Sequence, residues 1–404
     1  MNETLKIAIM PGKSALYAKH IELVSKSRLA DFAGYLMPLW FSSISAEHAA
    51  VRESAGLFDC THMGVLQVSG PGAEAFINYF TTNNVSAISP GKSQYSYVLD
   101  HSGDILDDII VSKIENNNYM IVVNAANEEK IKDWIGLLAA QHQGVIVKDL
   151  KNSPDLDAKV DIAFQGPKSA DILGLIIGDC PFNQQVQSLK PFTFVLGRID
   201  GVEVIVSRSG YTGAKIGFEI FIHPDKAPWI WDEILEKGKQ FGAVPCGLGA
   251  RDSLRIEAGL PLYSHELAGA HHITPFEAGY GWAVKLEKET FIGADSIADT
   301  SDMTVARLAL SGEKGVRPIR IGDGVVSAGG VCIGEVLSCA KAADKQIAIS
   351  YIQKEFAEAG NPIGIYYLAR SKGQVAKGRL EKAVTGDELG SDITGEILTR
   401  FERF

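Results

Sequence analysis

Short apolar runs separated by turn residues dominate the chain, and the clearest of them predicts a β-hairpin over residues 95–111. Its first strand is rich in β-prone side chains, and a His-Ser-Gly-Asp turn follows it. The second strand, residues 105–111, is apolar except for two adjacent acids, Asp107 and Asp108. Because successive side chains of a strand point to opposite faces, only one of these acids can face a given pocket.

The two acids of this strand need partners, because a carboxylate is costly to bury unless it is paired or hydrogen-bonded. Alternation places Asp108 on one face with Ile110, and Asp107 on the other face with Ile109 and Val111. Most buried acids are structural, so for the hairpin alone tying down the turn is a simpler interpretation than chemistry. The rest of the sequence has to decide between the two.

Other segments predict helices and strands in mixed order. Helices are expected over residues 14–25, after an N-cap at Ser45, after an N-cap at Asn127, and from Asp225 onward. Residues 193–208 predict a second hairpin, because an Asp-Gly turn separates two β-prone runs. The chain therefore carries both kinds of element along most of its length.

The second half of the chain changes character. A linker-like stretch at residues 151–157 predicts a module boundary, and residues 280–286 predict a strand. From about residue 304 onward, short strands broken by glycines predict a separate β-rich domain. After residue 383 the sequence is polar and acidic, which predicts a loosely attached tail.

Length and composition restrict the class of protein. At 404 residues the chain is long enough for two or three domains. A net charge of -10 with no concentrated basic block argues against nucleic acid or an anionic membrane as the main partner. No apolar run approaches the roughly 20 residues of a membrane span, and the N-terminus shows no secretory signal. The five cysteines are scattered and form no Cys-x-x-Cys pair, which is typical of reduced thiols in the cytoplasm.

Histidines gather once, where His265, His271 and His272 lie near Glu266. Their spacing differs from the His-Glu-x-x-His pattern of zinc enzymes, and no further ligand is evident, so no metal site is expected. His265 is instead a candidate for contact with a substrate.

Seven separated stretches, in order from about residue 12 to residue 293, carry motifs that occur together in one family. They are Asp31-Phe-Ala-Gly with Met37-Pro38; Glu47-His48-x-x-Val51-Arg52 with Gly56-x-Phe58-Asp59-x-x-His62-Met63-Gly64; Tyr95-Ser96 with Gly103-x-x-x-Asp107-Asp108; Val123-Asn124-Ala125; Gln165-Gly166-Pro167; Gly210-Tyr211-Thr212-Gly213 with Gly217-x-Glu219; and Gly247-Leu-Gly-Ala-Arg251-Asp252-x-x-Arg255-x-Glu257-Ala258. In this combination the chain resembles the T-protein of the glycine cleavage system, a folate-dependent aminomethyltransferase.

The resemblance implies an α+β fold, a three-domain cloverleaf that binds folate and ends in a C-terminal β-barrel. Domain 1 is expected to be discontinuous, over residues 1–60 and 158–295, with an α+β domain 2 inserted at residues 61–157. The barrel is expected over residues 300–383 and the polar tail over residues 384–404.

The resemblance also implies roles for single residues. Asp108 matches the aspartate beside the reactive nitrogens of the folate, where a catalytic carboxylate can draw on the N5 proton and raise the nucleophilicity of N5. Asp107 keeps the structural role. Glu219 matches the glutamate that accepts from the pterin N3–H and 2-amino group. The residues implied to bind the cofactor, tetrahydrofolate, are Met63, Tyr95, Ile110, Asn124, Tyr211, Glu219 and Arg251.

Each of these residues also has a plainer interpretation. Met63 and Tyr95 are of types that usually lie in the core. Arg251 could form a helix-surface ion pair with Asp252, which would contribute little to stability. Glu219, on a predicted strand, could be a solvated acid.

The function implied by the resemblance is transfer of the methylene group of aminomethyl-dihydrolipoyl H-protein to tetrahydrofolate, with release of ammonia. The implied partner is the lipoylated H-protein. Three departures from the family pattern concern the loops at residues 213–217 and 264–274 and the C-terminal stretch 337–343. They lie mostly away from the pterin motifs, so they leave open a tetrahydrofolate-dependent demethylase of a small methylated S-, O- or N-compound. A non-enzymatic folate-binding protein of the kind linked to iron–sulfur cluster assembly would carry Lys-Gly-Cys-Tyr-x-Gly-Gln-Glu, which is absent.

Overall fold

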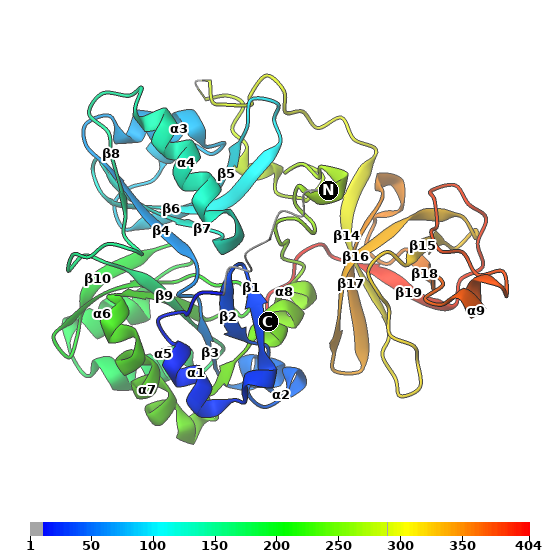
Figure 1. The fold of residues 1–404 in the computed structure, drawn as a ribbon, viewed down its shortest axis with the longest axis horizontal. Coiled ribbons are helices and arrows are strands. Elements are labelled where there is room, and N and C mark those ends of the chain that lie inside the picture. Colours follow the sequence, from blue (N-terminus) through cyan, green and yellow to red (C-terminus); the bar gives the residue numbers. More distant parts are fainter. Residues whose placement is uncertain (1–10, 289) are drawn as a thin grey trace, which may run out of the picture.

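The computed structural model describes residues 11–288 and 290–404, and three large β-sheet units organise the chain. Figure 1 shows two helix-covered sheets next to each other and a barrel on the far side of α8 (Leu248–Ala258). A small two-stranded ribbon, β1 (Leu29–Phe32) and β2 (Tyr35–Pro38), lies close to the N-terminal end of the described chain. The predicted α+β class with a C-terminal barrel is confirmed.

The first unit is built on a six-stranded sheet with the order β10-β11-β12-β9-β3-β13. Its strands are β3 (Gly56–Asp59), β9 (Val160–Gln165), β10 (Phe194–Ile199), β11 (Val202–Ser207), β12 (Gly217–Ile222) and β13 (Val244–Cys246). One face packs against α5 (Ser169–Ile177) and α7 (Ala227–Gly238), where Phe164, Ile172 and Ile230 share an apolar core. The opposite face carries the alternate side chains of the same strands and is turned toward the second unit.

The second unit is inserted between β3 and β9 and is built on a five-stranded sheet with the order β5-β6-β7-β4-β8. Its strands are β4 (Gly64–Ser69), β5 (Lys92–Leu99), β6 (Ile105–Glu115), β7 (Asn118–Val123) and β8 (Ile146–Asp149). Helices α3 (Ala73–Phe80) and α4 (Glu128–Ala139) bury Phe76 and Ile131 against one face. The hairpin predicted over residues 95–111 is the β5–β6 pair.

The third unit is a closed barrel in the order β14-β17-β16-β15-β18-β19. Its strands are β14 (Met303–Ser311), β15 (Gly324–Ser327), β16 (Cys332–Ala342), β17 (Lys345–Gln353), β18 (Pro362–Tyr366) and β19 (Ile393–Leu398). Between β18 and β19 the chain forms the short helix α9 (Lys372–Val375). The core of the barrel contains Leu308, Ala348, Ile365 and Ile397.

The loose polar tail predicted for residues 384–404 is wrong. Strand β19 pairs with both β14 and β18 and closes the barrel, and Ile397 is only 1% exposed. The last residues then return to domain 1, where the backbone N–H of Phe404 donates to the carbonyl of Gly213 at 2.9 Å. Only two apolar side chains, Ile393 and Ile397, face inward from a polar sequence, so the strand pattern was too weak to recognise. The other domain boundaries stay predictions.

Three smaller predictions also need correction. Helix α1 (Tyr17–Leu23) is shorter than predicted, and α2 (Ile44–Glu53) is capped by Ser43, whose side chain accepts from the Ala46 N–H. Residues 280–286 form no strand but a short 3-10 turn, Gly281–Ala283. The hairpin at residues 193–208 is confirmed as the β10–β11 pair. No helix in the described ranges has the length and apolarity needed to cross a bilayer.

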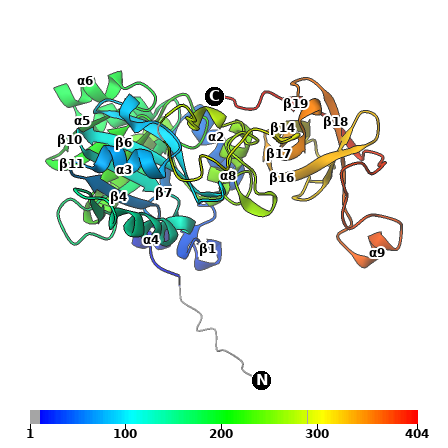
Figure 2. The same ribbon diagram turned by 90° about the horizontal axis from the view of Figure 1, so that it is seen from above.

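Helix α8 connects the barrel to the rest of the molecule, and it lies between the two in both views (Figures 1 and 2). Arg255 of α8 is 1% exposed and donates to Glu266 at 2.7 Å and to Ser338 of β16 at 3.0 Å. The pair with Glu266 compensates the buried charge of Arg255, and the hydrogen bond to Ser338 joins α8 to the barrel.

The role of β19 gives a testable expectation. Replacing Ile397 with Ala leaves a cavity in the barrel, and we expect the free energy of unfolding to fall by about 2–5 kcal/mol. Val384→Ala is the matched control, because Val384 is 57% exposed and lies before β19; its effect should stay within about 0.5 kcal/mol. Urea unfolding measures both variants, and equal, small effects would contradict a structural role for the C-terminal segment.

Candidate active site

A cavity of about 330 Å³ lies between the sheets of the first two units, with part of its wall supplied by the chain after α8. All eight residues predicted from the sequence to form a site line it. They are Met63, Tyr95, Asp108, Ile110, Asn124, Tyr211, Glu219 and Arg251. These residues are separated by up to 188 positions in the chain (251 minus 63), so the fold alone brings them together. Their individual roles stay predictions.

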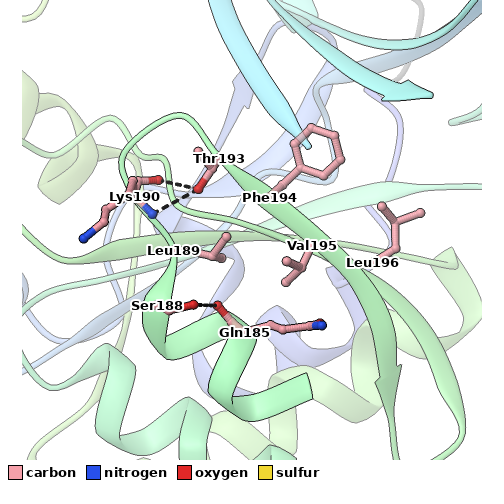
Figure 3. Close-up of a pocket in the computed structure, with 8 residues that line it drawn as sticks. All are labelled: Gln185, Ser188, Leu189, Lys190, Thr193, Phe194, Val195 and Leu196. Carbon is pink, nitrogen blue, oxygen red and sulfur yellow. Dashed lines mark hydrogen bonds between the residues drawn. The ribbon is translucent and has the colours of Figure 1, made fainter. Parts of the chain in front are cut away.

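A second, more open depression of about 510 Å³ lies between α6 (Pro181–Ser188) and β10, as Figure 3 shows. It is lined by one charged side chain, Lys190, together with apolar and small polar residues. Its hydroxyls bond to local backbone: Thr193 donates to the Lys190 carbonyl at 2.8 Å, and Ser188 to the Gln185 carbonyl at 2.9 Å. None of the predicted site residues lies there, and its lining contains no carboxyl or imidazole side chain.

Strand β6 places Asp108 in the cavity wall, as the alternation argument requires. The Tyr95 hydroxyl, from the paired strand β5, donates to Asp108 Oδ2 at 3.0 Å. The Asn124 side-chain amide, just after β7, donates to Asp108 Oδ1 at 2.9 Å. Two donors from neighbouring strands therefore orient one carboxylate toward the cavity.

Asp107 points to the other side and has no exposed surface. It accepts from the backbone N–H of Asn124 at 3.0 Å, from the Asn124 side-chain amide at 2.9 Å and from the Asn127 amide at 2.5 Å. The Asn127 side chain therefore binds Asp107 and does not cap α4, although Asn127 occupies the predicted N-cap position. Three internal donors and no access to the cavity suit a structural role for Asp107.

Burial is the largest influence on both acids of β6, because it disfavours the charged form. It raises the pKa of Asp108, and the bonds from Tyr95 and Asn124 offset part of that rise. Burial raises the pKa of Asp107 too, and the nearby charge of Asp108 raises it further. A carboxyl with a raised pKa is better suited to exchange a proton near neutral pH.

A second polar group of residues lies on the face of the six-stranded sheet that is turned to the cavity. Glu219 of β12 accepts a short hydrogen bond from the Ser209 hydroxyl. Arg251 of α8 donates to the Cys60 sulfur at 2.9 Å, and its guanidinium lies 5.1 Å from the centre of the Tyr211 ring. The Tyr211 hydroxyl donates to the Pro261 carbonyl at 2.5 Å, so its ring, more than its hydroxyl, is available to a ligand.

Sequence reasoning missed one acid in this group. Asp161 is the second residue of β9, is 3% exposed and lines the cavity. Burial raises the pKa of Asp161 well above its usual range, and the charge of Glu219 adds to this effect. The signal was present, because Asp161 interrupts the apolar run at residues 160–164 just as Asp107 and Asp108 interrupt theirs.

Sequence reasoning also missed an aromatic wall. Tyr280 and Trp282 line the cavity beside Tyr95, with ring centres 5.1 Å and 6.1 Å from that of Tyr95. Trp282 is 52% exposed, which is unusual for so large an apolar side chain. The incorrect strand prediction over residues 280–286 concealed these rings, because it placed them in a sheet.

The histidine-containing loop divides between two locations. His265 lines the cavity, and its Nδ1 lies 3.4 Å from the Ser338 hydroxyl. His271 contacts Glu335 at 3.1 Å and His272 contacts Asp104 at 3.2 Å. In the part of the chain that the structure describes, no three side chains of His, Cys, Asp or Glu are grouped to hold a metal ion.

Comparison with known proteins points in one direction. A sequence model of the GCVT N-terminal domain matches residues 16–288. An aminomethyltransferase of Caldanaerobacter subterraneus subsp. tengcongensis is 38% identical over 348 residues, 84% of this chain and 88% of that protein. An aminomethyltransferase of Chlorobium luteolum is 42% identical over 286 residues, 70% of this chain and 74% of that protein. The crystal structure of the glycine cleavage system aminomethyltransferase T from Bartonella henselae superposes with a TM-score of 0.78 at 27% identity, covering 97% and 99% of the two chains.

The raised pKa of Asp161 gives a prediction about stability. The folded protein binds this proton more tightly than the unfolded chain, so unfolding free energy falls as pH rises from about 4 through the raised pKa. Asp161→Asn removes this cost, and the ligand-free variant should be more stable than the parent protein at pH about 8, with the difference shrinking toward pH about 4.

Denaturant unfolding across this pH range makes the measurement. Asp171→Asn, which changes a 62% exposed acid on α5, serves as the matched control and should show no such pH-dependent gain. A parent protein that is as stable as Asp161→Asn at high pH would mean that Asp161 is not held at a cost.

Proposed function

The chain belongs to the GCVT family, the T-protein family of the glycine cleavage system, and from this premise we propose that it is an aminomethyltransferase acting on tetrahydrofolate. Its reaction transfers the methylene group of the aminomethyl-dihydrolipoyl arm of the H-protein to tetrahydrofolate and releases ammonia. The observation that carries the proposal is the cavity in which Asp108 lies together with Glu219, Arg251 and the aromatic wall.

The residues of the cavity suit tetrahydrofolate. Glu219 offers two acceptor oxygens to the donor–donor edge formed by the pterin N3–H and 2-amino group. Tyr95, Trp282 and Met63 offer flat or polarisable surfaces to the pterin and aminobenzoyl rings. Bound tetrahydrofolate supplies the nitrogen N5, which accepts the methylene group.

Asp108 is the group we assign to proton transfer. Its two oxygens are oriented by the hydroxyl of Tyr95 and the amide of Asn124, so its position does not depend on the ligand. Burial raises the pKa of Asp108, which brings the proton affinity of its carboxylate closer to the working pH of an enzyme. The carboxylate accepts a proton from the reacting nitrogen, and the buried surroundings keep bulk water from competing.

We assign the one-carbon donor to the lipoyl arm of an H-protein because the curated relatives carry the name aminomethyltransferase. We assign the protein to the cytoplasm on chemical grounds: all five of its cysteines are free, which suits a reducing compartment.

A second candidate function has one observation in its favour. His265, on the loop that departs from the family pattern, lines the cavity. A site that keeps the residues for folate but changes those that contact the one-carbon donor would suit a tetrahydrofolate-dependent demethylase of a small methylated compound. The two functions differ in product, because only the aminomethyl donor yields ammonia.

The assay that separates them uses purified protein and H-protein loaded with the aminomethyl-lipoyl group. We expect ammonia release that depends on tetrahydrofolate, because N5 must accept the methylene group. H-protein carrying unmodified lipoyl is the control and should give none. Absence of ammonia from the loaded H-protein, with tetrahydrofolate bound, would favour the demethylase.

The role of Asp108 is tested by Asp108→Asn, which keeps the shape of the side chain but removes the proton acceptor. We expect affinity for tetrahydrofolate to change little and the transfer rate to fall about a hundredfold to ten-thousandfold. Asp104→Asn, in the turn of the same hairpin and 52% exposed, is the control and should keep its activity. Full activity in Asp108→Asn would refute the assignment.

A further inference from the structure

Two carboxyls, the buried Asp161 and the half-buried Glu219, share the cavity-facing side of the β9–β12 pair. The antiparallel register places Asp161 opposite Phe221 and Ala163 opposite Glu219. Residues opposite each other in an antiparallel pair point to the same face, so Asp161 and Glu219 are diagonal neighbours on one face, with Cα atoms about 7–8 Å apart. Both side chains line the cavity.

The two carboxyls differ in how the protein satisfies them. Glu219 accepts from the Ser209 hydroxyl. Within the described ranges, Asp161 Oδ1 has no hydrogen-bond partner. Arg251 is instead occupied by the Cys60 sulfur at 2.9 Å and by the ring of Tyr211.

Leaving Asp161 Oδ1 unpaired is costly, since a buried polar group without a hydrogen bond costs about 1–3 kcal/mol and a charged one more. Such local violations of folding rules are expected where a ligand later supplies the missing partner. Burial and the charge of Glu219 raise the pKa of Asp161, and the charge of Arg251 offsets part of that rise. In its neutral form, Asp161 offers one donor and one acceptor side by side.

A pterin presents two different edges around its 2-amino group. On one side, N3–H and an amino hydrogen form a donor–donor edge. On the other side, the ring nitrogen N1 accepts while the second amino hydrogen donates. A carboxylate complements the first edge, and a carboxylic acid complements the second.

We propose that Asp161, as a neutral carboxylic acid, is a second pterin-binding residue that holds the N1/2-amino edge while Glu219 holds the N3/2-amino edge. The inference rests on the proposed function, because it takes tetrahydrofolate as the ligand of this cavity. It makes the 2-amino group, shared by two carboxyls, the main determinant of pterin recognition.

Calorimetric titration with 5-formyltetrahydrofolate tests the assignment. Asp161→Asn keeps one donor and one acceptor, so its Kd should stay within about threefold of the parent value. Asp161→Leu leaves the edge unpaired and should weaken binding by about tenfold or more, as should Glu219→Gln, which sets an amide donor against a donor edge. Asp171→Asn, on an exposed acid, should bind like the parent protein.

A second ligand identifies the contacted group. With a 5-formyltetrahydrofolate analogue whose 2-amino group is replaced by methyl, the loss caused by Asp161→Leu should become smaller, because the hydrogen bond from the 2-amino group is gone and only the bond to N1 remains to be lost. An undiminished loss with this analogue, or parent-like binding of 5-formyltetrahydrofolate by Asp161→Leu, would overturn the inference. If Asp161→Asn loses as much affinity for 5-formyltetrahydrofolate as Asp161→Leu does, Asp161 does not bind the pterin as a neutral carboxylic acid.

One spectroscopic measurement does not depend on the Leu variant folding. Infrared difference spectra should show a protonated-carboxyl signal when 5-formyltetrahydrofolate is added to the parent protein. Because Asp107, Asp108 and Glu219 also have raised pKa values, the contribution of Asp161 is the part of this signal that is missing from Asp161→Asn. Identical signals in the parent protein and in Asp161→Asn would overturn the assignment. Failure of the parent protein to bind 5-formyltetrahydrofolate would instead overturn the proposed function, so the two failures are distinct.

Discussion

The side-chain amide of Asn124 donates to both Asp107 and Asp108. This shared contact lets Asp107 serve the scaffold while Asp108 faces the cavity. It ties the end of β7 to the middle of β6, where two like charges would otherwise repel at close range. Asp107 takes three internal donors and becomes part of the scaffold. Asp108 is thereby held on the cavity side with the Tyr95 hydroxyl as its second donor. A scaffold that fixes the first acid so tightly can present the second one for chemistry.

Further acids with raised pKa values lie across the cavity from β6. Burial raises the pKa of Asp108, Asp161 and Glu219. Arg251 is the one arginine or lysine of the described wall, and its charge offsets part of this rise at Asp161 and Glu219. Three acids facing one cavity lower the stability of the ligand-free protein, because burial disfavours their charged forms. A ligand rich in N–H donors would relieve that cost on binding. Burial of these acids would therefore both favour binding of such a ligand and lower the stability of the ligand-free protein.

The elements and site residues that could be predicted from the sequence were those marked by strong local patterns. Alternation along β6 was enough to separate Asp107 from Asp108, because the strand is long and strongly apolar. Asp161 also interrupts an apolar run, but its strand is buried on both faces, so alternation did not show which face the acid occupies. Trp282 was misplaced since aromatic residues between glycines resemble a strand, whereas packing beside Tyr95 determines their position. The motifs located the site only through family resemblance, since no local pattern reports that distant segments converge.

We propose that this cavity binds tetrahydrofolate with its reacting nitrogen at Asp108, and not at Asp107. A crystal structure of the protein with tetrahydrofolate bound would show the position of that nitrogen. We expect a pterin in the cavity with N5 toward Asp108 and its 2-amino edge at Glu219, while Asp107 keeps its bonds to Asn124 and Asn127. A folate bound outside the cavity, or with N5 turned away from Asp108, would contradict it.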